Sequence, residues 1–283
     1  MTISIGPSGR SRPFMQVDVF TDAPYYGNPV GVVLDAGGLS DEQMLRMTRW
    51  ANVSETTFVL APTEAGADYR VRIFSPVGEL PFAGHPTLGT AHAWMAHTGS
   101  DQGPVVQECG AGLVQVRRAP CGLAFAAPPV TRSGPVDAAL VDHIAATLNL
   151  DRASVIGSQW VDNGPGWVAV MLRDAAAVLE LRPGTVDLDV GVVGFYPEGA
   201  ELAYEVRAFF PKDGGTTEDP VTGSLHASLA QWLTGTGRLT APYVAGQGTA
   251  LGRRGRVHVQ QDEEGAIWVG GGTLTCVVGE VWA

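Results

Sequence analysis

Two short stretches of this chain resemble each other, and this internal similarity constrains the fold more than any other feature. The segments His85–Ala93 and Asp219–Ala227 share Pro, Gly, His and Ala in register. A second pair, Gly27–Val33 and Asn163–Val170, recurs in the same order at nearly the same offset. Two matches in one order favour a duplicated unit, and two units are too few for a solenoid. We therefore expect two similar halves that face each other across a cleft.

Both copies of the first stretch predict the start of a helix. His85 and Asp219 each precede a Pro that suits the first helical position, so they are expected to cap the helices. The next amides, in residues 87–89 and 221–223, would then be unpaired donors that attract anions. Two such helix starts facing each other indicate a site for a small anionic molecule. The alternative is a pair of ordinary capped helices in a duplicated scaffold.

Charge and cysteine content exclude several classes of partner. The net charge of −11 argues against nucleic acid and anionic membranes, which are bound through clustered Lys and Arg. No apolar run reaches membrane-spanning length and no secretory signal is seen at the N-terminus, so a cytoplasmic location is expected. Three cysteines far apart in the chain indicate reduced thiols.

The pattern of strands and helices divides the chain. Residues 1–13, rich in Gly and Ser, are expected to form a disordered leader, and residues 14–127 and 130–271 two domains. A capping box at Ser40 predicts a helix to about residue 51. Two longer helices, over about 86–97 and 220–233, are apolar nearly all round and should be surrounded by strands.

Several polar residues are candidates for chemistry. Glu55 lies in a turn between a helix and a strand, where a carboxylate shielded from water would have a raised pKa and could move a proton. The alternative is an ordinary solvated turn residue. His85 can titrate or simply cap a helix, and Asp219 is a good N-cap. Ser224, expected inside the helix, can bind substrate or merely pack.

Other types of site do not fit the spacing. No G-x-S-x-G elbow accompanies Ser224, and no H-E-x-x-H or C-x-x-C motif is found. A Gly-rich dinucleotide fingerprint in its strand–turn–helix context is also missing. The sequence therefore predicts neither a metal site nor a nucleotide cofactor.

Four blocks of the sequence, in order, resemble the phenazine-biosynthesis PhzF family. They are Val17–Phe20 with Gly27–Pro29, then Asn52–Thr56, Phe74–Pro86 and Glu218–Ser224. The resemblance implies an α+β fold of two similar diaminopimelate-epimerase-like domains, each a barrel-like, mostly antiparallel sheet around a central helix. It also implies a homodimer, no cofactor, and a C-terminal strand, 272–283, that returns to the first domain.

The resemblance also implies roles for particular residues. Glu55 is similar to the family's catalytic acid/base, and His85, Asp219 and Ser224 to its partners in binding substrate and relaying the proton. The wider substrate-binding set that we expect is Gly84, Thr222, Gly223 and Asn28. The cysteine pair of the related epimerases is missing from both helix starts. Two-base racemisation by cysteine is therefore not expected.

The activity that the resemblance implies is a cofactor-independent isomerisation of a small carboxylate. The phenazine enzymes isomerise trans-2,3-dihydro-3-hydroxyanthranilate by moving a hydrogen from C3 to C1. Two alternatives stay open. One is an amino-acid epimerase or isomerase of the same superfamily with another substrate, and the other is a catalytically silent protein that binds small carboxylates.

Overall fold

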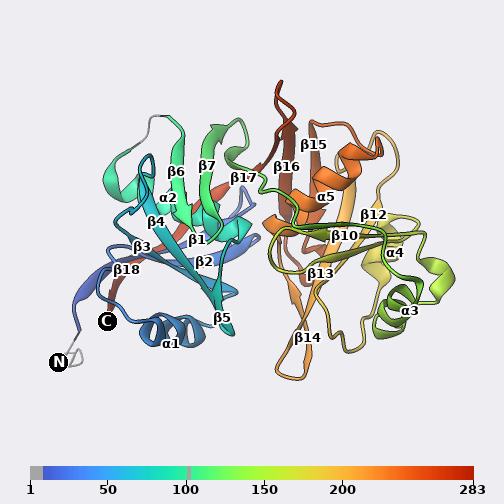
Figure 1. Ribbon diagram of the computed structural model, residues 1–283, viewed down its shortest axis with the longest axis horizontal. Coiled ribbons are helices and arrows are strands. Elements are labelled where there is room, and N and C mark those ends of the chain that lie inside the picture. Colours follow the sequence, from blue (N-terminus) through green and yellow to red (C-terminus); the bar gives the residue numbers. More distant parts are fainter. Residues whose placement is uncertain (1–8, 101–102) are drawn as a thin grey trace.

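The computed structural model describes residues 9–100 and 103–283, a mixed α/β chain with a large sheet and few helices (Figure 1). The elements of the first half are β1 (Ser11–Val19), β2 (Asn28–Val33), α1 (Asp41–Ala51), β3 (Glu55–Leu60), β4 (Tyr69–Ser75), β5 (Gly78–Leu80), α2 (Gly84–Thr98), β6 (Val105–Cys109), β7 (Gly112–Ala119) and β8 (Gly122–Ala126). The predicted capping box of α1 is confirmed, with Ser40 and Gln43 bonded reciprocally.

The second half opens with a short strand, a helix and a 3₁₀ turn, and then repeats the order of the first half. Its elements are β9 (Arg132–Gly134), α3 (Ala138–Thr147), a 3₁₀ turn (Arg152–Ser154), β10 (Gly157–Asp162), β11 (Val168–Met171), α4 (Ala175–Glu180), β12 (Val190–Phe195), β13 (Tyr204–Lys212), β14 (Gly215–Asp219), α5 (Gly223–Gly235), β15 (Tyr243–Gln247), a second 3₁₀ turn (Thr249–Leu251), β16 (Gly255–Gln261), β17 (Ile267–Gly271) and β18 (Thr273–Trp282). Figure 1 shows the two halves side by side.

The pairing of strands is the same in both halves. Strand β2 runs parallel to β3, and β11 runs parallel to β12 in the same way. Antiparallel β3 and β4 correspond to β12 and β13. The parallel pair β4 and β6 corresponds to β13 and β15. Two antiparallel pairs, β8 with β17 and β1 with β18, join the two halves into a single hydrogen-bonded network.

The two long helices are buried on nearly every side, as their apolar sequences predict. Helix α2 contacts β1, β2, β3, β6, β8 and β18, and α5 contacts β10, β16 and β17. In α2, every residue from Gly84 to Ala91 is buried, so no polar stripe faces water. No helix among the described residues has the length and apolar character needed to cross a membrane.

The predicted helix starts are wrong by a few residues. The N-cap positions are Ala83 and Thr222, and neither side chain makes a capping bond. Asp219 ends β14, where it pairs with Ala208, and the chain stays out of helical geometry through Thr222. Hydrogen bonds to the Val221 carbonyl and from the Thr222 amide hold this segment outside the helix. Pro220 therefore precedes α5 instead of starting it.

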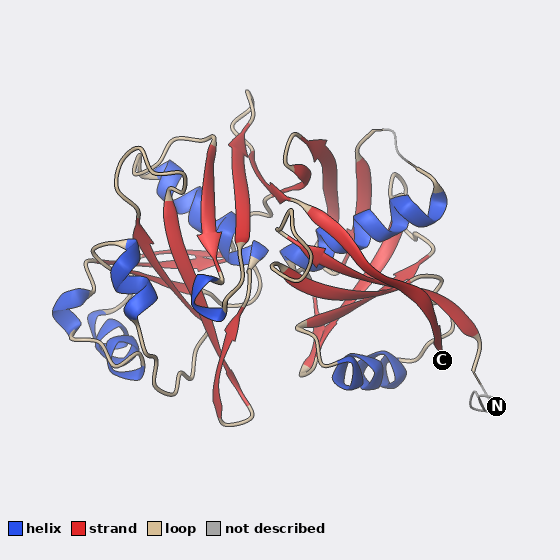
Figure 2. Cartoon of the chain, turned by 180° about the vertical axis from the view of Figure 1, so that it is seen from behind, coloured by secondary structure: helices blue, strands red, loops and turns tan. Residues whose placement is uncertain are grey.

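The starts of α2 and α5 touch through glycine (Figure 2). A Cβ atom added to Gly84 would lie 2.7 Å from the Cα of Gly223, and one added to Gly223 would lie 2.9 Å from the Cα of Gly84. Real side chains do not approach backbone so closely, so this contact requires glycine on both sides. His85 and Ser224, each the second residue of its helix, therefore occupy corresponding places. The similarity between the two sequence stretches pairs His85 with Asp219 instead.

The two ends of the described chain lie together. Strand β18 pairs antiparallel with β1 from Ser11, opposite Trp282, to Val19, opposite Thr273. The C-terminal strand thus returns to the first half, as the resemblance implied. The expected disordered leader, residues 1–13, is wrong for Ser11 to Pro13, because these residues pair with β18. Residues 1–8 of that prediction lie outside the described residues.

The glycine contact leads to a test of stability. Gly223→Ala should lower the free energy of unfolding by ~1–3 kcal/mol, because the new methyl group must displace the start of α2. Gly235→Ala, at the exposed end of the same helix with no atom within 4 Å of the added carbon, should be neutral or stabilising by up to ~1 kcal/mol. Urea denaturation measures both, and equal stability of the two variants would contradict the contact.

Candidate active site

A cavity of ≈ 520 Å³ opens where the two helix starts meet, and both halves line it. Its walls are largely apolar. The first half contributes Ser54, Glu55, Ala83, Gly84 and His85, and the second half Trp167, Asp189, Lys212, Asp219, Thr222, Gly223 and Ser224. Seven of the eight residues expected from the sequence therefore line one cavity: Glu55, Gly84, His85, Asp219, Thr222, Gly223 and Ser224.

Glu55 is the first residue of β3 and follows the left-handed turn at Asn52 that ends α1. Only 17% of its side chain is exposed, and its Oε2 atom lies 3.3 Å from Nε2 of His85. Burial raises the pKa of Glu55 well above its ordinary value, and the nearby negative charge of Asp219 raises it further. A carboxyl group in this environment holds its proton more strongly than one in water.

His85 is buried, and burial alone lowers its pKa to about 3. The imidazole is therefore neutral near pH 7, and its contact with Glu55 is not an ion pair. Its Nδ1 atom lies 3.2 Å from the amide nitrogen of Asn28, which is a donor. The ring proton therefore belongs on Nε2, facing Glu55. Neither Nε2 nor the Glu55 Oε2 atom makes a hydrogen bond within the described residues, and both atoms are buried.

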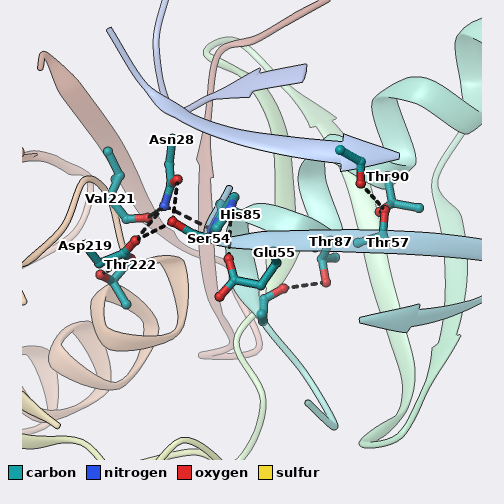
Figure 3. A network of polar contacts seen from close by, with 12 residues as sticks. Asn28, Ser54, Glu55, Thr57, His85, Thr87, Thr90, Asp219, Val221 and Thr222 are labelled. Atoms are coloured by element: carbon teal, nitrogen blue, oxygen red, sulfur yellow. Dashed lines mark hydrogen bonds and ion pairs between the residues drawn. The ribbon is translucent and has the colours of Figure 1, made fainter. Parts of the chain in front are cut away.

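Asp219 is buried, and its carboxylate accepts hydrogen bonds from neighbouring side chains (Figure 3). Thr222 donates to Oδ2 at 2.6 Å, and Asn28 donates to Oδ1 at 2.9 Å. Ser54 lies farther from Oδ1, at 3.4 Å. Burial raises the pKa of Asp219 to about 6, although these hydrogen bonds work in the opposite direction. Hydrogen bonds therefore stabilise the negative charge of Asp219 more than that of the neighbouring Glu55.

Asn28 was expected to bind substrate, and its location contradicts this. The side chain is fully buried and does not line the cavity. Its amide nitrogen instead contacts the Asp219 carboxylate and the Val221 carbonyl, both at 2.9 Å, and Nδ1 of His85. Asn28 therefore links β2 of the first half to the loop before α5 of the second half, and holds two site residues in place.

The free amides at the helix starts agree only in part with those expected, since Gly223 is the one expected donor among them. The Thr87 amide is bonded to the Ala83 carbonyl, and the Thr222 amide to Gln247. The amides without an acceptor inside their own helix are instead those of its first residues, Gly84 with His85 and Gly223 with Ser224. These residues line the cavity, so the anion-binding role expected of the helix starts moves to them.

Ser224 lies at the mouth of α5, not inside the helix as expected, and its Oγ atom accepts a hydrogen bond from Trp167 at 3.2 Å. Trp167, Asn163 and Asp189 were missed as site residues. Asn163 donates to the Ser224 carbonyl, and both it and Trp167 belong to the second matched stretch, which was a usable signal. Asp189, whose pKa burial raises to about 6, has no local sequence signal.

The described residues contain no group of three or more His, Cys, Asp or Glu side chains arranged to hold a metal ion. What the site offers is a set of hydrogen-bonding and proton-exchanging groups. The raised Glu55 pKa, the neutral His85 donor and the convergent helix-start amides suit a small molecule that carries an anionic group and exchanges a proton.

Comparison with known proteins points to one family. Residues 17–279 match the family model for phenazine biosynthesis-like proteins, PhzC-PhzF. Antisense-enhancing sequence 1 of Schizosaccharomyces pombe is 32% identical over 291 residues, covering 94% of this chain and 97% of that protein. Trans-2,3-dihydro-3-hydroxyanthranilate isomerase of Pseudomonas aeruginosa is 35% identical over 266 residues, covering 89% and 91%.

Solved structures agree on the fold. The crystal structure of a PhzF-family phenazine biosynthesis protein from Bacillus anthracis superposes with a TM-score of 0.79. The alignment covers 96% of this chain and 99% of that one at 23% sequence identity. At this identity the superposition shows a shared fold.

The raised pKa of Glu55 predicts a pH effect on stability. The folded protein keeps a Glu55 proton that the unfolded chain releases above pH ~4.5, so this stabilisation is present below that pH and is lost as pH rises through the folded pKa. A glutamine at this position does not titrate. Glu55→Gln should therefore gain stability relative to the wild type as pH rises above ~4.5, as measured by urea denaturation.

The control is Glu263→Gln, which removes an exposed carboxylate in a turn far along the chain. This variant should follow the wild-type pH dependence throughout. If Glu55→Gln also follows it, the burial of an ionisable group at position 55 is contradicted.

Proposed function

This chain belongs to the PhzC-PhzF family of phenazine biosynthesis-like proteins and is an isomerase, and from this premise we propose that it moves a proton within a small cyclic amino- or hydroxy-carboxylate, with Glu55 as the acid/base. One observation carries the proposal. A buried carboxyl group with a raised pKa lies beside a neutral imidazole, in a cavity that also holds two helix starts.

The substrate that we propose first is trans-2,3-dihydro-3-hydroxyanthranilate, the substrate named for three Pseudomonas relatives at 35–37% identity. The amides of Gly223 and Ser224 bind its carboxylate, because helix starts favour anions. Asp219, held as an acceptor by Thr222 and Asn28, orients its amino group. Trp167 and Phe210 in the cavity wall provide apolar surface for its ring.

In the proposed reaction, Glu55 first releases its proton to solvent as the substrate binds, and the chemical step begins with the carboxylate, which takes the hydrogen at C3 as a proton. The electron pair of the C3–H bond passes into the conjugated ring as a dienol-like intermediate, which the Nε2–H of His85 stabilises through a hydrogen bond. Glu55 then returns the proton to C1. The carboxyl group ends as it began, so the step balances without a second reactant. The raised pKa makes Glu55 a stronger base than a surface carboxylate.

We also propose the finer architecture that the resemblance implies. Residues 14–127 and 130–271 form two diaminopimelate-epimerase-like domains that arose by duplication, with barrel-like sheets around α2 and α5, and β18 added to the first. The repeated strand pairing supports this division. The protein is proposed to act in the cytoplasm as a homodimer.

A two-base epimerisation is less well supported. It would need a second free base opposite Glu55, and the neighbouring carboxylate of Asp219 accepts hydrogen bonds on both oxygens. A silent carboxylate-binding protein would not need the raised pKa of Glu55, and turnover separates it from an isomerase.

Turnover of trans-2,3-dihydro-3-hydroxyanthranilate tests the role of Glu55. Glu55→Gln should lose about 10²–10⁴-fold in kcat, because the positioned acid/base is removed, while calorimetry shows binding of the substrate retained. Glu263→Gln serves as the control. Unchanged turnover in Glu55→Gln would rule out the catalytic role.

Isotope exchange tests the proton's route. In D₂O, deuterium should enter C1 of the product whenever the proton exchanges with solvent while it resides on Glu55. A wild-type protein that binds the substrate without turning it over would refute this substrate and leave the other carboxylates to be screened.

A further inference from the structure

A line of buried hydrogen bonds connects the interior of the second half to the candidate site. It runs from Tyr204 on β13 through His226 on α5 and Gln247 on β15 to Thr222 and Asp219 at the cavity. Tyr204, His226 and Gln247 are each 0% exposed, so water cannot replace any of these bonds. Nothing in the proposed reaction so far uses the three inner residues.

Backbone groups determine which atom donates and which accepts in each of these hydrogen bonds. The Gln247 Nε2 atom donates to the Asp219 carbonyl at 3.0 Å, and Oε1 accepts from the Thr222 amide at 2.9 Å, so the side-chain amide can take only one orientation. Oε1 must then also accept from Nε2 of His226, at 3.0 Å. The ring proton of His226 is therefore on Nε2, and Nδ1 accepts from the Tyr204 hydroxyl at 2.9 Å.

The donor and acceptor roles can be assigned in the same way as far as the carboxylate of Asp219. Gln247 Nε2 donates to the Thr222 hydroxyl oxygen at 2.9 Å, so the hydrogen of that hydroxyl is free to point at Asp219 Oδ2. Asn28 donates to the other oxygen. A proton placed on Asp219 would meet a donor on either side. Glu55 Oε2 faces a single donor, Nε2 of His85 at 3.3 Å, and makes no hydrogen bond among the described residues.

The first half contains a similar chain of hydrogen bonds, but its last acceptor is of a different kind. Tyr69 donates to Gln107 at 3.2 Å, Gln107 donates to Thr87 at 2.9 Å, and Thr87 donates to the Ala83 carbonyl at 2.9 Å. Tyr69 and Tyr204 begin the corresponding strands β4 and β13. The first line ends on a backbone carbonyl, whereas the second ends on a group that can ionise.

We propose that Tyr204, His226 and Gln247 are positioning residues that keep Asp219 a hydrogen-bond acceptor and thereby leave the exchangeable proton of the pair on Glu55. The inference deepens the proposed function and rests on it, because it assigns the two carboxyl groups different states before substrate binds. The other ionisable groups around Asp219 are Glu55 on β3, His85 on α2 and Glu218 on β14, which is paired with Arg207 on β13.

The test compares two matched pairs of variants. Gln247→Met and Tyr204→Phe interrupt the line that ends on Asp219, and Gln107→Met and Tyr69→Phe interrupt the line that ends on Ala83. The readout is the ¹³C NMR titration of the carboxyl carbon of Asp219 in protein labelled at aspartate, assigned by its loss in Asp219→Asn. It requires no turnover, so it remains decisive even if the proposed substrate is wrong.

Gln247→Met should raise the titration midpoint of Asp219 by about one pH unit, a tenfold change in proton affinity, because Thr222 loses the donor that orients it. Tyr204→Phe, one link farther away and milder for folding, should raise it by less. In an active enzyme the acidic limb of the kcat/KM profile should move with it. The two first-half variants should leave the midpoint unchanged while losing comparable stability.

Two results would overturn the inference. One is an Asp219 midpoint in folded Tyr204→Phe and Gln247→Met that matches the wild type. The other is an equal shift in the first-half variants, which would mean that the midpoint follows general loosening of the core. Near-ultraviolet circular dichroism confirms that each variant is folded, and Tyr204→Phe serves alone if Gln247→Met does not fold.

Discussion

The contact between Gly84 and Gly223 is the constraint on which the site depends. It brings two helix starts to one point, and each carries about half a positive charge. Two such ends in contact repel each other unless negative charge lies beside them. Asp219 and Glu55 supply it, yet both are buried and cannot both ionise cheaply. The positive helix starts and the two buried carboxyl groups therefore stabilise one another, and in our proposal one carboxyl group is charged and the other protonated.

The hydrogen bonds between the halves keep this arrangement in register. Asn28 belongs to β2, but its amide contacts Asp219 and Val221 across the junction as well as His85 on its own side. The buried side-chain amide of Asn28 thus fixes both the tautomer of His85 and the position of Asp219. Asn28 can therefore position site residues without reaching the cavity.

Much of the fold could be predicted from the sequence, because the signals were local. The reciprocal bonds of Ser40 and Gln43, and the all-apolar faces of α2 and α5, follow from residues a few positions apart. The start of α5 was predicted wrongly because Pro220 looks like a first helical residue. The bonds that hold it outside the helix come from Asn28 and Gln247, which are distant in sequence. Gln247 and Tyr204 gave no signal for the same reason.

The pairing of β1 with β18 has a consequence for how the chain is made. The first half is synthesised early, but one strand of its sheet is the last described element to leave the ribosome. Until then β1 has β2 but lacks its second neighbour, and the side of α2 that contacts β18 stays uncovered. Contacts this distant in sequence form slowly and leave an open sheet edge exposed in the meantime. The nascent first half should therefore need shielding by a chaperone until β18 has been synthesised.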